Sequence, residues 1–235
     1  MGKKIYSSFD YIIHMASHRD HYSNACFSDF RKKTIYLDIP NFEPFPICNY
    51  EEIKDYRRLI YAGAFYPSVR EPFFMFSLLK ILNRKYSVTL DIYTGNSMRN
   101  YLIKESNENN FIYLHNEVSE NELMNYIKES DVLLSVGNND SDFLPSKTLM
   151  YMSTYKPIIH FYSDADDVSL KYFSFYPNIL MIDQRKEIND EMINQVIEFL
   201  KNKNSISNKS FERLSADLYK NSPQYSAKRL VELIK

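Results

Sequence analysis

The sequence contains only two cysteines, Cys26 and Cys48, and they form no C-x-x-C pair. So few cysteines in unlike contexts argue against a disulfide framework and against a zinc site. Three histidines near the start, His14, His18 and His21, match no zinc-ligand spacing, and no acidic cluster completes a site around them. We therefore expect a chain that needs no metal and works in a reducing compartment, the cytoplasm.

Charge of either sign is not in excess, since 29 Lys and Arg residues stand against 30 Asp and Glu residues. Without a basic stripe, the 20 Tyr and 16 Phe residues do not indicate base stacking, and we expect no nucleic-acid partner. The longest apolar run, PFFMFSLLKIL, is about half the length that crosses a bilayer. A membrane span is not expected, although a peripheral contact with the inner membrane face stays open.

Familiar catalytic signatures are also missing. There is no G-x-S-x-G nucleophile elbow and no Walker glycine-lysine loop, which argues against hydrolases of that kind and against P-loop proteins. His160 lies inside the apolar run PIIHF, where a core or cleft histidine is a better interpretation than a general base.

What the sequence does have, from residue 57 onward, is an alternation of short apolar runs with helical patterns. This alternation is typical of βαβ units and a parallel sheet. We predict an α/β fold, a doubly wound, Rossmann-like parallel sheet of about six strands. The predicted strands are 57–65, 87–95, 111–118, 131–137, 156–162 and 178–183.

The predicted helices lie between these strands, at 71–85, 97–107, 119–130, 146–155, 164–173 and 190–203. One of their starts carries a clear signal, because Ser119 is followed three residues later by Glu122, the spacing of a capping box.

The remainder of the chain divides around this sheet. Residues 1–45 hold two strand-like runs, too little for a closed core of their own, and we interpret them as the last piece of a preceding domain. Residues 46–56, with an acidic cluster after Pro46, are predicted to be a linker. The Rossmann-like domain would span 57–205, and 206–235 would form C-terminal helices broken near Ser222-Pro223.

The stretch SDFLPSKTLM places a proline, a serine and a lysine between a predicted strand and a predicted helix. Pro145 at the first helical position would leave the amides of Ser146, Lys147 and Thr148 free to bind an anion. Taken alone, the same residues are also consistent with an ordinary helix start and a solvated lysine.

A second loop favours the anion site. The stretch YAGAFYPSVREP puts Gly63, where a ligand can approach the backbone, just before Arg70, whose guanidinium can pair with a diphosphate. Because parallel strands end at one edge of their sheet, we expect both loops to lie there. The two loops together predict a nucleotide diphosphate between them.

These motifs resemble a known family. The series YAGAFYPSVREP, LDIYTG, LHNEVSENELMNYIKESDVLLSVGN and DFLPSKTLMYMSTYKPII is similar to the C-terminal half of GT-B glycosyltransferases, in particular the large retaining family four. The resemblance covers about residues 57–205 and implies that this segment is a nucleotide-sugar-binding domain. It also implies that residues 1–45 are a remnant of the N-terminal, acceptor-side domain.

The resemblance implies roles for particular residues. Ser146 and Lys147 would hold the donor diphosphate with help from Arg70, and Gly63 would let the backbone approach. The segment His115 to Val118, which includes Asn116, would border the base, chiefly through main-chain groups.

Two further positions correspond to the family's pair of acids. Asp142 takes the place of the first acid, near the donor sugar, and is the candidate catalytic residue. The second acid, which binds the ribose hydroxyls, is replaced by Met150, so donor binding would be weak, use another group such as Tyr151, or be lost.

The implied activity is transfer of a sugar, with retention, from a nucleotide-diphosphate sugar to a glycan or lipid-linked acceptor in surface polysaccharide biosynthesis. The nucleotide sugar is a substrate, no cofactor or metal is expected, and an N-terminal half-domain on another chain is a candidate partner. The alternative is a non-catalytic nucleotide-sugar-binding module or an inactive fragment.

Overall fold

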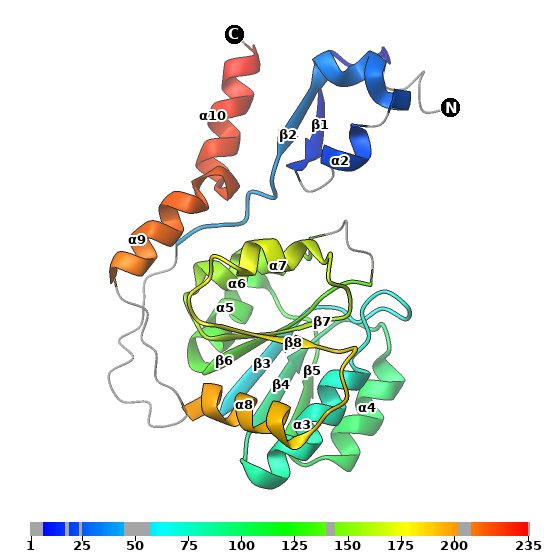
Figure 1. Cartoon of the computed structure of the whole chain (residues 1–235), viewed down its shortest axis with the longest axis vertical. Helices are drawn as coiled ribbons and strands as arrows, with labels where there is room; N and C mark the ends of the chain where they lie inside the picture. Colours follow the sequence, from blue (N-terminus) through cyan, green and yellow to red (C-terminus); the bar gives the residue numbers. More distant parts are fainter. Residues whose placement is uncertain are drawn as a thin grey trace.

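The structure, a computed structural model, describes residues 7–16, 19–23, 25–44, 57–139, 144–201 and 208–234. Six parallel strands form one sheet in the order β5-β4-β3-β6-β7-β8 (Figure 1). The chain starts this sheet in the middle, winds outward to β5, returns beside β3, and winds out to β8. This order confirms the predicted doubly wound sheet. The strands are β3 (Arg58–Ala62), β4 (Thr89–Tyr93), β5 (Ile112–His115), β6 (Val132–Val136), β7 (Ile158–Tyr162) and β8 (Ile179–Asp183).

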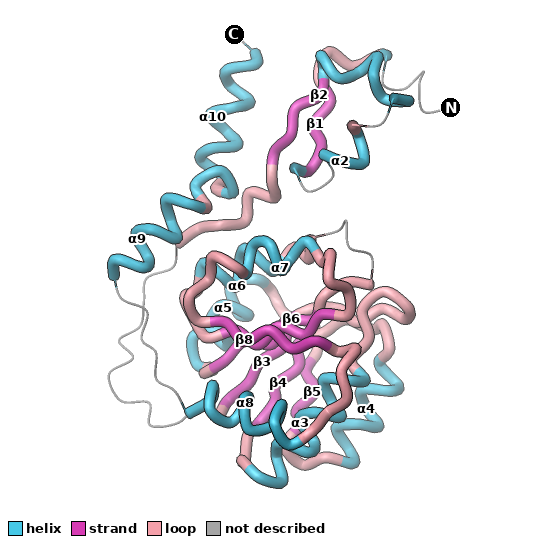
Figure 2. Tube along the Cα trace, in the orientation of Figure 1, coloured by secondary structure: helices cyan, strands magenta, loops and turns pink. Residues whose placement is uncertain are grey.

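Helices cover both faces of the sheet (Figure 2). One face packs against α3, α4 and α8, and the other packs against α5, α6 and α7. Alternate residues of each strand enter the two cores, so Leu59 lies in the first and Ile60 in the second. The helices are α3 (Phe73–Lys85), α4 (Arg99–Glu108), α5 (Glu120–Glu129), α6 (Lys147–Ser153), α7 (Val168–Phe173) and α8 (Asp190–Lys201).

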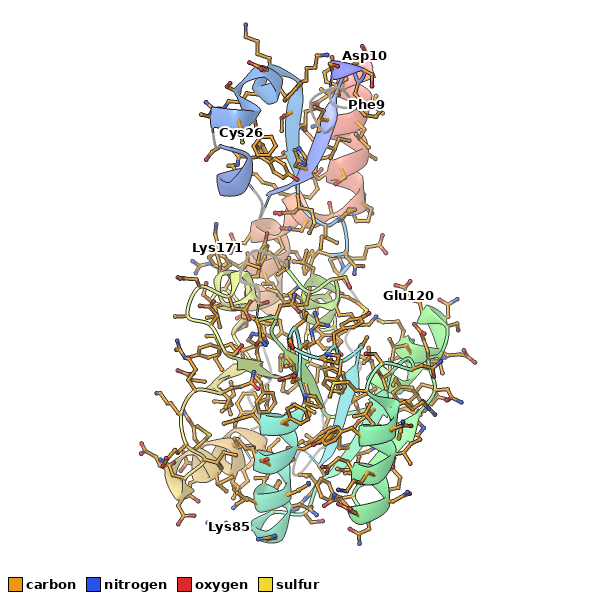
Figure 3. The ribbon with its side chains drawn as sticks, turned by 90° about the vertical axis from the view of Figure 1, so that its right-hand side faces the viewer. Phe9, Asp10, Cys26, Lys85, Glu120 and Lys171 are labelled. Carbon is orange, nitrogen blue, oxygen red and sulfur yellow. The ribbon has the colours of Figure 1, made fainter. Side chains whose placement is uncertain are left out.

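The N-terminal and C-terminal segments lie on the side of α6 and α7 (Figure 1). Strands β1 (Ile12–Met15) and β2 (Thr34–Leu37) form a separate parallel pair, and α2 (Arg19–Tyr22) and the 3-10 helix η2 (Ala25–Lys33) connect them. The C-terminal segment consists of α9 (Asn208–Asp217), the 3-10 helix η3 (Tyr219–Asn221) and α10 (Pro223–Ile234). In Figure 3, Lys171 of α7 lies toward these segments and Lys85 at the end of α3 lies at the opposite end.

Specific contacts attach these segments to the sheet domain. The Tyr172 hydroxyl on α7 donates to Asp38 Oδ1 at 2.9 Å, and the hydroxyls of Tyr155 and Ser215 lie 2.8 Å apart. Phe42 is 1% exposed and belongs to the same apolar cluster as α5 and α6. Its amide donates to the carbonyl of Asn221 at 3.0 Å. Residues 39–42 and α9 therefore share a core with the sheet, whereas the buried residues Ile12, Phe30 and Leu37 of β1, η2 and β2 belong to neither sheet core.

The observed elements agree with the predicted ones to within a few residues at each end. The predicted linker at 46–56 lies outside the described residues. One helix start differs, because α6 begins at Lys147 with Ser146 as its N-cap, so Pro145 is not its first helical residue. No helix in the described ranges is both long enough and apolar enough to cross a membrane.

The capping box at α5 holds the loop that precedes this helix. Ser119 accepts the Glu122 amide, and the Glu122 carboxylate accepts the Ser119 amide. The Ser119 hydroxyl and amide hold the pKa of the Glu122 carboxyl below its usual range. The charged carboxylate is therefore the form that completes the box.

We expect Ser119→Ala to lower the free energy of unfolding by about 1 kcal/mol, since an N-cap is lost. Urea unfolding at several pH values measures this. The loss should be full at neutral pH and shrink as the pH falls through the lowered pKa of Glu122, because protonation also breaks the box. Ser77→Ala in α3, where the hydroxyl only bonds the Phe73 carbonyl within the helix, is the matched control and should be nearly neutral. Equal losses in the two variants would contradict the role of the cap.

Candidate functional site

The chain reverses its direction of winding between two neighbouring strands, β3 and β6. The segment after β3 leads to α3 on one face, and the segment after β6 leads to α6 on the other. Such a reversal opens a crevice at the carboxyl ends of the strands. A pocket of about 430 Å³ lies there, lined from the segments that follow β3, β4, β5 and β6.

Arg70 reaches this pocket from a tight turn after β3. Tyr66 and Arg70 exchange two backbone hydrogen bonds, each 2.9 Å long, and Ser68 between them adopts a left-handed φ of 63°. The guanidinium donates to Asn138 Oδ1 at 2.7 and 3.1 Å and to the Ala64 carbonyl at 3.4 Å. Neutral acceptors therefore hold Arg70, and no acid among the described residues forms an ion pair with its guanidinium.

Lys147 lines the same pocket from the first position of α6. Its side chain is half-buried, and the described residues provide it with no hydrogen bond or ion pair. Neither Lys147 nor Arg70 forms an ion pair with a described acid. Among the described lining residues the one acid is Glu117, which is exposed at the rim. The pocket thus presents two cations against one solvated carboxylate, which favours an anionic ligand.

The backbone contributes less to the anion site than we expected. The Thr148 amide already donates to the Pro145 carbonyl at 3.0 Å, so the prediction of three free amides is wrong for Thr148. The Ser146 carbonyl accepts the Asn41 side-chain amide at 3.0 Å. Helix α6 has only seven residues, and its dipole is correspondingly small. The electrostatic character of the pocket therefore depends on side-chain charges.

The structure brings together part of the predicted site. Gly63, Arg70, Val118, Ser146 and Lys147 all line the pocket. At Gly63 a Cβ atom would come within 3.3 Å of the Tyr61 hydroxyl. The absence of a side chain at Gly63 therefore lets the backbone pack against the Tyr61 ring.

His115 and Asn116 are not among the residues that line the pocket. His115 Nε2 lies 2.7 Å from Asp91 Oδ1, and its ring stacks on Tyr93, which does line the pocket, at 4.5 Å between centroids. Asn116 accepts a hydrogen bond from Arg99. Neither residue therefore borders the pocket directly.

The two positions that resemble the family's acids provide no described carboxylate. Asp142 lies outside the described residues. Met150 is 5% exposed, belongs to the apolar cluster under α5 and α6, and does not line the pocket. A polar replacement at this position would be buried in an apolar core.

Tyr151 lines the pocket, but its hydroxyl is engaged. It accepts the Ala62 amide at 2.9 Å and donates to the Ala62 carbonyl at 3.1 Å, so it bridges the end of β3. Burial raises the pKa of Tyr151, which keeps the hydroxyl protonated as this bridge requires. The expectation that Tyr151 replaces the missing acid is therefore not supported by its hydrogen bonds.

Burial also raises the pKa of Tyr61 to about 12, although Arg70 opposes the shift.

Sequence reasoning missed several polar side chains of the pocket, and for Thr148 it considered the amide alone. Thr94 and Thr148 are both 2% exposed, and their hydroxyls form no hydrogen bond within the described chain. Thr94 follows β4, and the segment Thr94–Ser97 contributes another wall. Ser135 was also missed, although it is a lone polar residue in the apolar strand VLLSV, a signal that could have identified it.

We expect Tyr151→Phe to destabilise the fold by about 1–3 kcal/mol, because the variant leaves the buried amide and carbonyl of Ala62 without their partner. Urea unfolding followed by circular dichroism measures the change. Tyr113→Phe, at a residue 48% exposed on β5, is the matched control and should stay within about 0.5 kcal/mol of the parent. If Tyr151→Phe matches that control, the bridge does not support the end of β3.

Comparison with known proteins places this geometry in context. No protein-family model and no curated protein matches the sequence. Among solved structures, TarM aligns with a TM-score of 0.66 at 12% identity, over 99% of this chain and 45% of TarM. Sucrose-phosphate synthase from Thermosynechococcus elongatus aligns with a TM-score of 0.62 at 13% identity, over 99% of this chain and 59% of that one.

The GtfA/B complex aligns with a TM-score of 0.55 at 14% identity, over 94% of this chain and 43% of the matched chain. This chain therefore spans about half the length of the structures that it resembles. These matched structures are GT-B glycosyltransferases, so the chain has the fold of the GT-B glycosyltransferases.

Proposed function

We propose that the pocket binds the diphosphate of a nucleotide sugar. The observation that carries this proposal is the convergence of Arg70 and Lys147 on one pocket at the strand reversal, without an ion pair to a described acid. A guanidinium and an ammonium suit two adjacent phosphates, one through a planar fork and the other as a point charge. A volume of about 430 Å³ also falls within the usual range of small-molecule sites.

The same charges support a role in catalysis. When a sugar leaves its nucleotide, negative charge accumulates on the departing diphosphate, and fixed cations stabilise that charge as it develops. Arg70 is held by Asn138 and Ala64 before any ligand arrives, so little reorganisation is needed. We assign to Arg70 and Lys147 the stabilisation of the leaving group.

We further propose that the chain supplies the donor-binding half of a glycosyltransferase. Its substrates would be a nucleotide-diphosphate sugar and a glycan or lipid-linked acceptor, and the sugar would be transferred with retention during surface polysaccharide biosynthesis. The GT-B fold supports this assignment. The acceptor would be bound with the help of an acceptor-side domain, and Asp142 is proposed to act near the donor sugar.

A second candidate is a nucleotide-sugar-binding module that does not transfer the sugar. Two observations favour it: Met150 is buried in the core, and the Tyr151 hydroxyl is engaged by Ala62. Calorimetry with UDP-glucose, GDP-mannose and ADP-glucose, followed by an assay of released nucleotide, separates the candidates. Binding with slow release of nucleoside diphosphate supports a transferase half. Binding without any release, also in the presence of glycan acceptors, supports the module.

We expect Lys147→Ala to weaken binding of UDP, GDP or ADP roughly ten- to hundredfold, because one charge-assisted hydrogen bond is lost. The corresponding nucleoside lacks phosphates, so its affinity should change less than about twofold. Titration calorimetry at two salt concentrations measures both, and Lys104→Ala on the exposed face of α4 is the charge-matched control. If Lys147→Ala weakens nucleoside and nucleotide equally, the ammonium does not contact the phosphates.

A further inference from the structure

A buried row of polar side chains leads from the pocket into the core between the sheet and α7. Ser135 on β6 and His160 on β7 are register partners, and Ser135 Oγ lies 3.0 Å from His160 Nδ1. His160 Nε2 in turn lies 3.5 Å from Asp167 Oδ2 at the start of α7, within ion-pair distance but too far for a good hydrogen bond, and neither atom has a hydrogen-bond partner within the described chain. The three residues are 6%, 0% and 3% exposed, respectively. We call this row the Ser135-His160-Asp167 chain.

Only one member of this chain reaches the pocket, and that member is Ser135. The His160 ring has no exposed surface and packs against Phe173 at 4.7 Å between centroids. His160 lies within reach of the Ser135 proton, at 3.0 Å, but a triad base must also reach the leaving group of the substrate, and this ring does not line the pocket. The arrangement therefore argues against a nucleophilic triad. It favours a hydrogen bond between Ser135 and a hydroxyl group of the ligand.

Asp167 is fitted closely to its position. Its Oδ1 accepts the Ser169 amide at 2.8 Å, as the N-cap of α7. A Cβ atom on Gly137 would come within 2.0 Å of Oδ2, so the absence of a side chain at Gly137 lets the carboxylate lie beside His160. Burial alone would raise the pKa of the Asp167 carboxyl, but His160 and the Ser169 amide outweigh it and lower the pKa. The carboxylate is thus ionised.

An ionised carboxylate near Nε2 favours the tautomer with its proton on Nε2. In the neutral form of this tautomer, which has one donor and one acceptor nitrogen, the Nδ1 lone pair accepts the hydroxyl proton of Ser135. With its proton committed to Nδ1, Ser135 Oγ retains only lone pairs for other partners. Its free hydrogen-bonding capacity is therefore that of an acceptor.

We propose that Ser135 accepts a hydrogen bond from a hydroxyl group of the bound nucleotide sugar, and that His160 and Asp167 are positioning residues that orient it. This inference rests on the proposed function and names the recognition element of the same pocket. Met150 offers no oxygen to the pocket, so the acceptor for a ligand hydroxyl comes from strand β6 instead of helix α6. The hydroxyl belongs either to the ribose or to the transferred sugar.

The test compares ligands that differ by one hydroxyl. Calorimetry first identifies which of UDP, GDP and ADP binds the parent protein most tightly. The 2′-deoxy and 3′-deoxy forms of that nucleotide, and its glucose conjugate, are then titrated into the parent and into Ser135→Ala. We expect Ser135→Ala to lose about three- to tenfold in affinity for the ligand that carries the contacted hydroxyl, and almost nothing for the form that lacks it.

The arms distinguish the two sources of the hydroxyl. A loss for the ribonucleotide that disappears in one deoxy form places the contact on the ribose. A loss confined to the glucose conjugate places it on the sugar. Unchanged affinities for every ligand, or equal losses for all of them, would overturn the inference.

His160→Phe and Asp167→Asn test the positioning roles. If they orient Ser135, both variants should lose affinity only for the ligand that carries the contacted hydroxyl. A purely structural defect would instead weaken the binding of all ligands alike. Gly137→Ala should act in the same way, since it displaces the Asp167 carboxylate. The control is Ser153→Ala, at a buried serine outside the pocket whose hydroxyl bonds the Met150 carbonyl at 2.7 Å; it should leave the selectivity unchanged. Should His160→Phe fail to fold, Ser135→Ala still decides the question.

This inference and the proposed function fail in different ways. If the parent protein binds no nucleoside diphosphate and no nucleotide sugar, both are wrong. If the parent binds and Lys147→Ala weakens binding while Ser135→Ala changes no selectivity, only the role of Ser135 is wrong.

Discussion

The reversal of winding between β3 and β6 is the constraint on which the site depends. Because α3 leaves toward one face and α6 toward the other, the segments after these neighbouring strands separate at the sheet edge. The crevice is a result of connectivity, and any sequence with this strand order must fill or line it. This chain does both, since Tyr151 bridges the end of β3 while charged and polar side chains line the space above it.

The pocket combines rigid support with positive charge that no described acid pairs with. Tyr151 bridges the end of β3, and the neutral side chain of Asn138 accepts from Arg70, so Arg70 is held without an opposing charge from Asn138. Lys147 adds a second positive charge from the other side of the reversal. An anion that binds to these cations in the folded protein alone would raise its stability. The buried Ser135-His160-Asp167 chain adds a neutral acceptor to the same pocket and so extends its chemistry from phosphates to hydroxyl groups.

Most of the fold could be predicted from the sequence, because its signals are local. The alternation of apolar runs gave the strands, and the Ser119 to Glu122 spacing gave a capping box that the structure contains. The convergence of Arg70 and Lys147 also followed, since the edge shared by parallel strands is a general property of such sheets. Their roles in binding remain predictions.

The remaining features depend on contacts between residues that are distant in the sequence. The Tyr151 hydroxyl finds its partner at Ala62, and no spacing rule connects the two. Ser135 faces His160 only because β6 and β7 pair in one particular register. The Thr148 amide was expected to be free because Pro145 was predicted to be the first helical residue. Helix starts are uncertain by a residue or two, and a shift of that size decides which amide is engaged.

The most direct test of the central claim is a crystal structure of the protein with the tightest-binding of UDP, GDP and ADP. The account predicts that the diphosphate lies between the Arg70 guanidinium and the Lys147 ammonium, with charge-assisted contacts of about 2.7–2.9 Å to each. A nucleotide bound elsewhere on the chain, or one whose phosphates point to solvent away from both cations, would contradict it.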